Sequence, residues 1–342
     1  MMKCFICFIL LLSLCGCANN NNETTTGEYN FSMKLYAPSN PMILSGFPEV
    51  AENKIVFCDQ YNYLFGEKEN ASGNVFVYDL ISKTENLCEI FANKTYLYDN
   101  YLYYFRGKVL VRTDLDTNLS EELYTISEDK LGGFSSGGDG YVIFWDSNDD
   151  YTDVTIYSYD ICNSKCSIVA KTNYLTSPFH TFKIKNGFFS YAEKQNEKFL
   201  IHGVSLKDIK NDIIIELNIE PAQMVYNGDV FVWSDYKGIH LERNKKIISI
   251  GSGTSDVDIF KNRYVFYFED FQIFIYDLID NKTVFSSSQY ENVEFCEWFD
   301  LDEDNNKAAF IAWDRETSRS IYPDWEYEEY PELIYIMEID KD

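Results

Sequence analysis

The sequence predicts an all-β fold, a seven-bladed β-propeller with four strands in each blade. Three observations predict it. A polar turn followed by an apolar strand recurs seven times, at intervals of 35 to 47 residues. A second unit, a strand that ends in Asp and an apolar residue, recurs between these turns. Aromatic residues make up 17% of the chain, with 27 Tyr and 26 Phe, and such side chains favour strands.

The seven turn-and-strand units define the blades. Their turns are rich in Asn, Asp and Gly, which reverse the chain because they tolerate left-handed backbone conformations. A period of about 40 residues matches blades of four strands and is too long for leucine-rich or ankyrin repeats. The units span 53–59, 99–105, 139–146, 186–191, 227–233, 261–267 and 304–310.

The second recurring unit predicts the hairpin between the third and fourth strands of a blade. It occurs at 75–80, 109–115, 156–161 and 273–278, each time followed by a short polar turn and another strand. We expect the Asp to accept hydrogen bonds from backbone amides in the turn, because short polar side chains do so readily. These Asp residues are therefore structural rather than catalytic.

The last blade appears in the sequence with three strands, at 293–299, 308–313 and 333–339. The segment 29–36 precedes the first blade and has the alternation of a strand. We expect it to complete the last blade and close the ring, which removes exposed sheet edges. Six or eight blades remain alternatives, because 31–52 has room for an extra hairpin.

The first residues predict that the protein is located at a membrane. Lys3 precedes an apolar run of signal-peptide length, too short for a comfortable transmembrane span, so 1–16 reads as a signal peptide. The run ends in Leu14-Cys15-Gly16-Cys17, which resembles the lipobox of bacterial lipoproteins with Cys17 as the lipidated residue. The polar segment 17–28 then forms a flexible tether, and 29–342 forms the propeller domain. The expected location is the extracytoplasmic side of a cell membrane, with ordinary cleavage or an uncleaved anchor as alternatives.

One stretch of the last blade carries a family resemblance. Residues 299–314 resemble the TolB/WD40-like propeller repeat, whose signature is a Ser-Pro-Asp-Gly-Lys turn before an apolar strand and a terminal Asp. Here 304–307 stands in for the turn and Asp314 for the terminal Asp, while the other six blades match less well. A lipobox followed by a divergent propeller resembles uncharacterised surface lipoproteins of Gram-positive bacteria. The resemblance implies a fold and an address and leaves the function open.

Charge and cysteine content bound the partners. The chain carries a formal net charge of −26, and loss of Lys3 with the signal peptide makes it −26 − 1 = −27. Such a surface repels nucleic acid, so no nucleic-acid partner is expected. Five cysteines lie beyond the lipobox, and Cys162 and Cys166 flank a predicted hairpin turn, which makes them a candidate disulfide. The others are expected to be small buried residues.

No sequence motif identifies an enzyme, a cofactor or a metal site. The match of 133–137 to the Gly-x-Ser-x-Gly elbow is rejected, because that elbow joins a strand to a helix and this stretch enters a strand. The acidic runs 300–304 and 146–153 lack the Gly and terminal Glu of a calcium loop. We therefore expect no cofactor and no metal.

Two long connections predict the binding face. The segments 59–73 in the first blade and 315–332 in the last become neighbours once the ring closes, and long ordered loops on a rigid scaffold often bind ligands. Their aromatic rings and carboxylates suit a glycan or a basic peptide. The candidate ligand-binding residues are Tyr61, Tyr63, Phe65, Tyr322, Trp325, Tyr327 and Tyr330.

The predicted function is that of a membrane-tethered extracytoplasmic protein that binds a protein or glycan partner at one propeller face. One alternative is a loop packed on its own aromatic residues, without a ligand. Another is a carbohydrate-active enzyme that uses carboxylates at the channel mouth, such as Asp59, Asp146 and Asp314. A third is a structural platform in an envelope complex.

Overall fold

The computed structural model describes residues 29–44, 48–59, 73–92, 94–173, 183–290, 292–325 and 330–341. Several predictions fall outside this part of the chain. They are the signal peptide 1–16, the lipidated Cys17, the tether 17–28, and the aromatic residues Tyr61, Tyr63, Phe65 and Tyr327.

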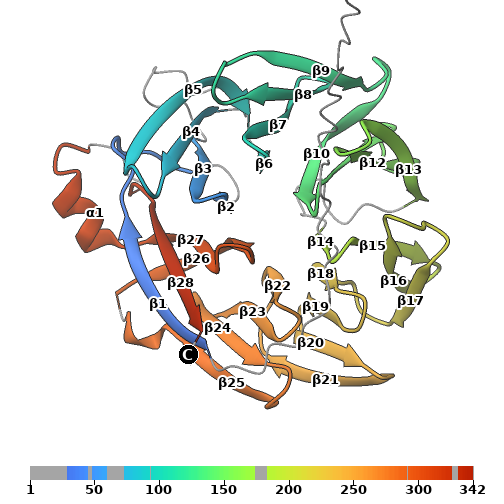
Figure 1. Ribbon diagram of the computed structural model, residues 1–342. Helices are drawn as coiled ribbons and strands as arrows, with labels where there is room; N and C mark the ends of the chain where they lie inside the picture. The colour runs from blue at the N-terminus through green and yellow to red at the C-terminus, as the bar shows by residue number, and fades with distance from the viewer. Residues whose placement is uncertain are drawn as a thin grey trace, which may run out of the picture.

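Seven sheets of four antiparallel strands stand in a ring, which confirms the predicted seven-bladed propeller (Figure 1). In each of the first six blades the strands pair in chain order. Blade 1 contains β2 (Glu49–Ala51), β3 (Lys54–Cys58), β4 (Gly73–Asp79) and β5 (Thr84–Ala92). Blade 2 contains β6 (Thr95–Tyr98), β7 (Tyr101–Arg106), β8 (Val109–Asp114) and β9 (Ser120–Thr125). Blade 3 contains β10 (Leu131–Gly138), β11 (Tyr141–Ser147), β12 (Val154–Asp160) and β13 (Lys165–Thr172).

The other blades repeat this plan. Blade 4 contains β14 (Ile184–Lys185), β15 (Phe188–Gln195), β16 (Lys198–Ser205) and β17 (Asp212–Leu217). Blade 5 contains β18 (Gln223–Tyr226), β19 (Phe231–Asp235), β20 (Gly238–Arg243) and β21 (Lys246–Gly251). Blade 6 contains β22 (Val257–Phe260), β23 (Tyr264–Glu269), β24 (Gln272–Asp277) and β25 (Lys282–Ser286), followed by the 3-10 turn η2 (Ser287–Gln289). Blade 7 contains β26 (Glu294–Asp302), β27 (Lys307–Trp313) and β28 (Leu333–Lys341), with the helix α1 (Arg315–Ile321) between the last two.

The N-terminal strand closes the ring, as the sequence predicts. Strand β1 (Tyr29–Tyr36) pairs with β28 along its whole length, from Tyr29 opposite Lys341 to Tyr36 opposite Ile334. Tyr29 is buried, and Phe31 and Met33 pack against the same core, while the residues between them are exposed. Alternate side chains of β1 therefore pack into the core between blades 6 and 7, and the side chains between them face solvent.

The hydrophobic core lies between the blades. On β27, Ala308 and Phe310 pack toward blade 6, whereas Ala309 and Ile311 pack toward blade 1. Both faces of the middle strands are thus covered, which explains why they are continuously apolar in the sequence.

The two recurring turns take the predicted roles. Asp79 accepts hydrogen bonds from the amides of Ile81 and Ser82, both at 2.8 Å. Asp114 and Asp277 act in the same way in their own hairpins. In the other turn, between the first and second strands, residues such as Asn53 (φ 59°) adopt the left-handed conformation.

The turns between first and second strands also join the blades to one another. Their polar side chains and amides bond across every blade boundary and form a ring around the centre. Between blades 2 and 3 the Gly140 amide donates to the Tyr96 hydroxyl at 3.4 Å. The other contacts between neighbouring blades join Glu52 to Asn100, Asp139 to Gly187, Asn186 to Asn227, Asn227 to Asn262, Lys261 to Asn306, and Asn53 to Asn305. Asn186 also bonds to Asn262, two blades away.

Two smaller expectations are settled in this part of the chain. Residues 133–137 lie on β10, so they form no elbow between a strand and a helix. A Cβ on Gly137 would come within 1.9 Å of the Tyr96 ring, and glycine is needed there for blades 2 and 3 to approach. The cysteines in the residues described here form no disulfide, so the candidate Cys162–Cys166 bridge is not present in this structure.

Candidate functional site

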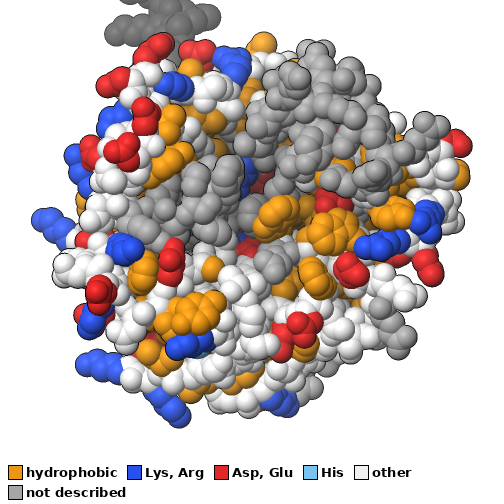
Figure 2. Space-filling model, turned by 180° about the vertical axis from the view of Figure 1, so that it is seen from behind, with side chains coloured by type: hydrophobic (Ala, Val, Ile, Leu, Met, Phe, Trp, Pro, Cys, Tyr) orange, Lys and Arg blue, Asp and Glu red, His pale blue; other side chains and the backbone are white. Residues whose placement is uncertain are grey.

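Charged side chains occupy the centre of the ring. Lys183 and Lys185 flank the buried Ile184 at the start of blade 4, and Asp256 and Asp258 stand in the same way at the start of blade 6. Alternate residues of a strand point to opposite sides, so the apolar residue enters a core and its charged neighbours face the axis. Figure 2 shows a hollow at the centre of one face, with charged side chains of both signs inside it.

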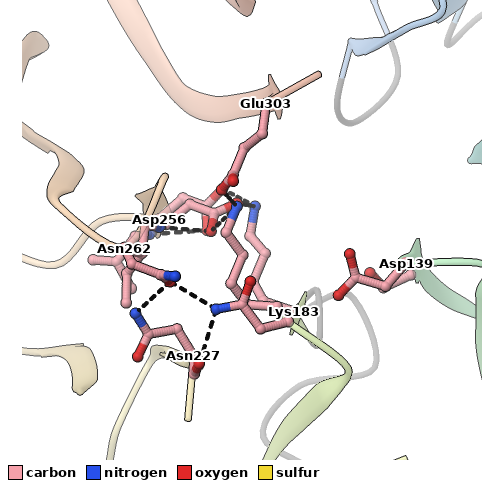
Figure 3. Close-up of polar contacts among 12 residues, drawn as sticks. Asp139, Lys183, Asn227, Asp256, Asn262 and Glu303 are labelled. Atoms are coloured by element: carbon pink, nitrogen blue, oxygen red, sulfur yellow. Dashed lines mark hydrogen bonds and ion pairs between the residues drawn. The ribbon is translucent and has the colours of Figure 1, made fainter. Parts of the chain in front are cut away.

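Ion pairs in this region cross the axis between blades that are not neighbours. Lys183 Nζ lies 3.1 Å from Asp256 and 3.7 Å from Asp258. Lys185 Nζ lies 3.8 Å from Asp258 and also contacts Glu303 of blade 7. Figure 3 shows Lys183, Asp256 and Glu303 of this group turned toward one another. Blade 4 is thereby linked to blades 6 and 7 through the centre. We call the following residues the axial cluster: Glu49, Lys94, Lys183, Lys185, Asp256, Asp258, Asp300 and Glu303.

Two further acids of the axial cluster bond to backbone across blade boundaries. Asp300 of blade 7 accepts a hydrogen bond from the amide of Val50 in blade 1, at 2.9 Å. Glu49 of blade 1 accepts from the amide of Leu97 and from the Thr95 hydroxyl of blade 2. The cluster therefore holds inner strands together in addition to filling the centre.

Burial changes the acidity of this cluster. It raises the pKa of Asp256 to about 6, although Lys183 acts in the opposite direction. Burial and the neighbouring Asp300 raise the pKa of Glu49 to about 8. The pKa of Lys94 is lowered to about 7, first by burial and then by Lys183. Burial also acts against the charge of Lys185, but Glu303 and Asp258 outweigh it and its pKa is raised.

These shifts predict a stability that depends on pH. Glu49 and Asp256 hold their protons more tightly in the folded chain than in the unfolded one, so their contribution is present at low pH. It is lost as the pH rises through about 6 for Asp256 and about 8 for Glu49. We expect the unfolding free energy to fall by on the order of 1–3 kcal/mol between pH 5 and pH 8. Urea denaturation across this range measures it.

The variant Glu49→Gln should flatten this slope, because the amide oxygen still accepts a hydrogen bond but no longer titrates. Lys94 contributes with the opposite sign. Because its pKa is lowered to about 7 in the folded chain, its contribution to the unfolding free energy rises as the pH increases above about 7. Glu128→Gln is the matched control, an exposed acid outside the cluster. A wild-type slope retained in Glu49→Gln would contradict the assignment.

The start of the first long connection of the predicted binding face lies close to the end of the second. Leu44 forms a β-bridge with Asp59, at the start of the first connection. Its amide also donates to Glu332 Oε2 at 2.8 Å, at the end of the second. Blades 1 and 7 therefore meet at this point, which we call the blade 7–blade 1 junction.

An exposed tryptophan stands at this junction. Trp313 ends β27 and is 38% exposed. Its indole Nε1 donates to Glu332 Oε1 at 2.8 Å, and Glu332 is itself buried. One carboxylate thus fixes both the Leu44 backbone and the Trp313 ring, and an exposed aromatic side chain is held in one orientation.

The predicted aromatic residues that can be placed are largely engaged by their own chain. Tyr322 is partly buried against the core between blades 6 and 7, and its hydroxyl donates to the Pro38 carbonyl. Tyr330 lies under the guanidinium groups of Arg315 and Arg319, 5.6 and 4.8 Å from the ring centre. Trp325 is partly exposed, and its amide donates to the Tyr322 carbonyl at 3.2 Å. Figure 1 places the nearby α1 on the outside of the ring rather than at the channel mouth.

The three carboxylates of the enzyme alternative belong to three different blades. Asp314 caps α1 by accepting from the Thr317 amide at 3.0 Å, and it also accepts from the Tyr335 hydroxyl at 3.0 Å. Asp146 accepts from the Tyr157 hydroxyl at 2.7 Å. Asp59 is fully buried. Their contacts give Asp146 and Asp314 structural roles within their own blades.

The sequence contains a signal for the axial cluster in two short charged motifs. Lys183-Ile184-Lys185 and Asp256-Val257-Asp258 each place two charges of one sign around one apolar residue, just before a turn of the repeat. On the first strand of a blade, that spacing directs both charges to the axis. Trp313 had no comparable signal, because its exposure depends on where β27 ends.

The described part of the chain contains no group of three or more His, Cys, Asp or Glu side chains placed to hold a metal ion. It also contains no helix long and apolar enough to cross a membrane.

Comparison with known proteins shows the fold. No protein-family model matches the chain, and no curated protein matches it. A structure of the mitotic checkpoint complex superposes with a TM-score of 0.53 and 10% identity, covering 98% of this chain and 98% of that chain. The β-propeller domain of the Trilobed protease from Pyrococcus furiosus gives 0.51 and 11%, covering 82% and 92%. Oligogalacturonate lyase from Vibrio parahaemolyticus gives 0.50 and 8%, covering 92% and 98%.

At these identities the likeness shows a β-propeller and carries no function, since one fold serves many activities. The finer resemblance of 299–314 to the TolB/WD40-like repeat stays a prediction.

Proposed function

We propose that this chain is a lipid-anchored extracytoplasmic propeller that binds a protein or glycan partner at the blade 7–blade 1 junction. The observation that carries the proposal is the exposed Trp313 ring held by the buried Glu332. Large aromatic side chains in fixed orientations are frequent centres of binding energy, because little side-chain freedom is lost when a partner covers them.

The surroundings of Trp313 support a contact surface over a catalytic one. The acids of the axial cluster are paired with lysines or bonded to backbone amides across the ring. Asp146 and Asp314 are occupied by tyrosine hydroxyls. Trp313, by contrast, offers its ring to solvent beside two connections that leave the sheets at the same point.

The point where the proposed tether would join the propeller fits this use. Tyr29, the first residue of β1, pairs with Lys341 at one end of β28, whereas Glu332 and Trp313 lie at the other end. A strand of this length spans roughly 30 Å. A tether that joins at Tyr29 therefore enters the propeller at the end of blade 7 opposite Trp313 and leaves the proposed contact surface clear of the attachment point.

Replacing Trp313 by alanine should weaken partner binding at least about tenfold, equivalent to about 1.4 kcal/mol. The measurement is a glycan array together with binding to isolated cell-envelope fractions, made with wild type and Trp313→Ala. Tyr236→Ala is the matched control, because Tyr236 is an aromatic residue of blade 5 that is 73% exposed. Trp325→Ala tests the predicted aromatic residue in the neighbouring connection.

Equal binding by wild type and Trp313→Ala would overturn the proposed surface, provided that both proteins melt at similar temperatures. The anchor is tested by expressing the variant Cys17→Ser in bacterial cells. This variant should be absent from the membrane fraction after the cells are fractionated. Retention of that variant in the membrane would contradict lipidation at Cys17.

A further inference from the structure

We infer that the group seated on Trp313 is a basic side chain, Lys or Arg, of a polypeptide partner, held between the indole ring and Glu294. This inference rests on the proposed function and names the class of partner for the same surface. Glu294, Trp313 and the carboxylate of Glu332 together carry it.

Glu294 and Trp313 stand directly opposite each other on the paired strands β26 and β27. Directly opposite residues point to the same face of a sheet, with their Cβ atoms about 4.5–5.5 Å apart. Both side chains are exposed. An exposed carboxylate therefore lies beside an exposed indole on one face of blade 7.

The hydrogen bond to Glu332 decides which chemistry the ring can offer. The indole has one polar hydrogen, and that hydrogen is donated to Glu332 Oε1 at 2.8 Å. Trp313 therefore has no donor left for a sugar hydroxyl and presents its π face. A π face with a carboxylate at its side attracts a cation, because the ring quadrupole and the acid act in the same direction.

Charge complementarity favours the same occupant. The chain carries a net charge of −26, so a basic partner is attracted over a distance of about one Debye length, roughly 10 Å at 0.1 M salt. Arg315 and Arg319, the basic residues of the adjoining helix α1, stack on Tyr330 instead of Trp313. Within the described residues no Lys or Arg is found over the Trp313 ring.

The test uses three fluorescein-labelled probes: a peptide of alternating Lys and Gly, the same peptide with Gln at each Lys, and neutral cellohexaose. Dissociation constants are measured at 50 and 200 mM salt for wild type, Glu294→Gln and Trp313→Leu. The glutamine variant removes one charge from an exposed position, and the leucine variant removes the π face while leaving an apolar side chain. Glu128→Gln, an exposed acid elsewhere, is the control.

We expect the lysine peptide to bind the wild type and to lose about three- to tenfold in affinity in each of the two variants. The loss should be smaller at 200 mM salt in Glu294→Gln, because salt screens an exposed charge. Glu128→Gln should change the affinity less than twofold, and the glutamine peptide should not bind.

The inference is overturned if the lysine peptide fails to bind, or binds both variants as it binds wild type. Cellohexaose binding that depends on Trp313 but not on Glu294 would overturn the inference and leave the proposed function standing. If no probe and no envelope fraction binds in a way that depends on Trp313, the proposed function fails as well.

Discussion

Replacing Lys183 by methionine is expected to lower the unfolding free energy by about 3–5 kcal/mol at pH 7. Lys183 is the partner of Asp256 at 3.1 Å and lies 3.7 Å from Asp258, and both acids are buried. Removing the ammonium leaves two buried carboxyl groups near each other with less positive charge to balance them. Methionine keeps an apolar stem near the Phe299 ring, which Lys183 also contacts, so the change is mainly electrostatic. Urea denaturation measures the loss.

Two comparisons make this result specific. Lys198→Met removes an ion pair with Glu216 on the surface, where both side chains are about half exposed, and should cost less than about 1 kcal/mol. The double variant Lys183→Met, Asp256→Asn should recover part of the loss, because it removes the acid that was left without its partner. The loss should also shrink at pH 5, below the raised pKa of Asp256 of about 6, since the acid is then neutral. Equal destabilisation by Lys183→Met and Lys198→Met would show that the axial cluster is not a buried charge network.

The architecture was predictable because its signals are local and repeated. A turn that needs a left-handed residue selects Asn, Asp or Gly wherever it occurs, so Asn53, Asn186 and Asn262 report the same turn in three blades. The closing role of β1 followed from counting strands in the last blade. These inferences require no knowledge of distances between blades.

The contacts around the centre were harder to predict because they join residues far apart in the sequence. Lys185 belongs to blade 4 and Glu303 to blade 7, so the two residues meet only because the ring brings three successive blades around the same axis. The segment 315–332 was expected to be a long loop of the binding face, whereas its first part folds into α1, capped by Asp314. The resemblance of 299–314 to a propeller repeat makes Asp314 the terminal Asp of a strand. The same residue is also a helix N-cap, a role that Asp often takes.

The proposed binding surface contains one feature that was predictable from the sequence and one that was not. The approach of the two long connections was expected from ring closure, and the contacts of Leu44 with Asp59 and Glu332 show it for the ends that are described. The ring that stands free there is Trp313 rather than Tyr322 or Tyr330. A sequence does not reveal which aromatic ring is covered by other residues, because this depends on how segments such as Pro38 and α1 pack in the folded chain.

Removing residues 1–36 should have the largest effect of any change considered, because it deletes β1 and reopens the ring. The deletion takes away the buried Tyr29 and the packed side chains of Phe31 and Met33, each worth about 1.5–3 kcal/mol when fully buried. It also leaves β28 as an exposed edge whose backbone groups have lost their partners along the whole pairing with β1. We expect a loss of more than about 5 kcal/mol, enough to unfold a protein of ordinary stability, together with aggregation seen by size-exclusion chromatography.

The matched control is removal of residues 1–28, which keeps β1 and should leave the melting temperature close to that of the longer chain. A deletion of 1–36 that melts at the same temperature as the deletion of 1–28 would mean that three-stranded blade 7 is stable without closure. The neighbourhood of blades 1 and 7 would then rest on the core around Ala309 and Ile311 and on the hydrogen bonds from Val50 to Asp300 and from Leu44 to Glu332. Closure matters for the proposed function for this reason: the strand that completes blade 7 is also the one that would join the proposed tether, so a pull on the proposed anchor would act directly on the β1–β28 pairing.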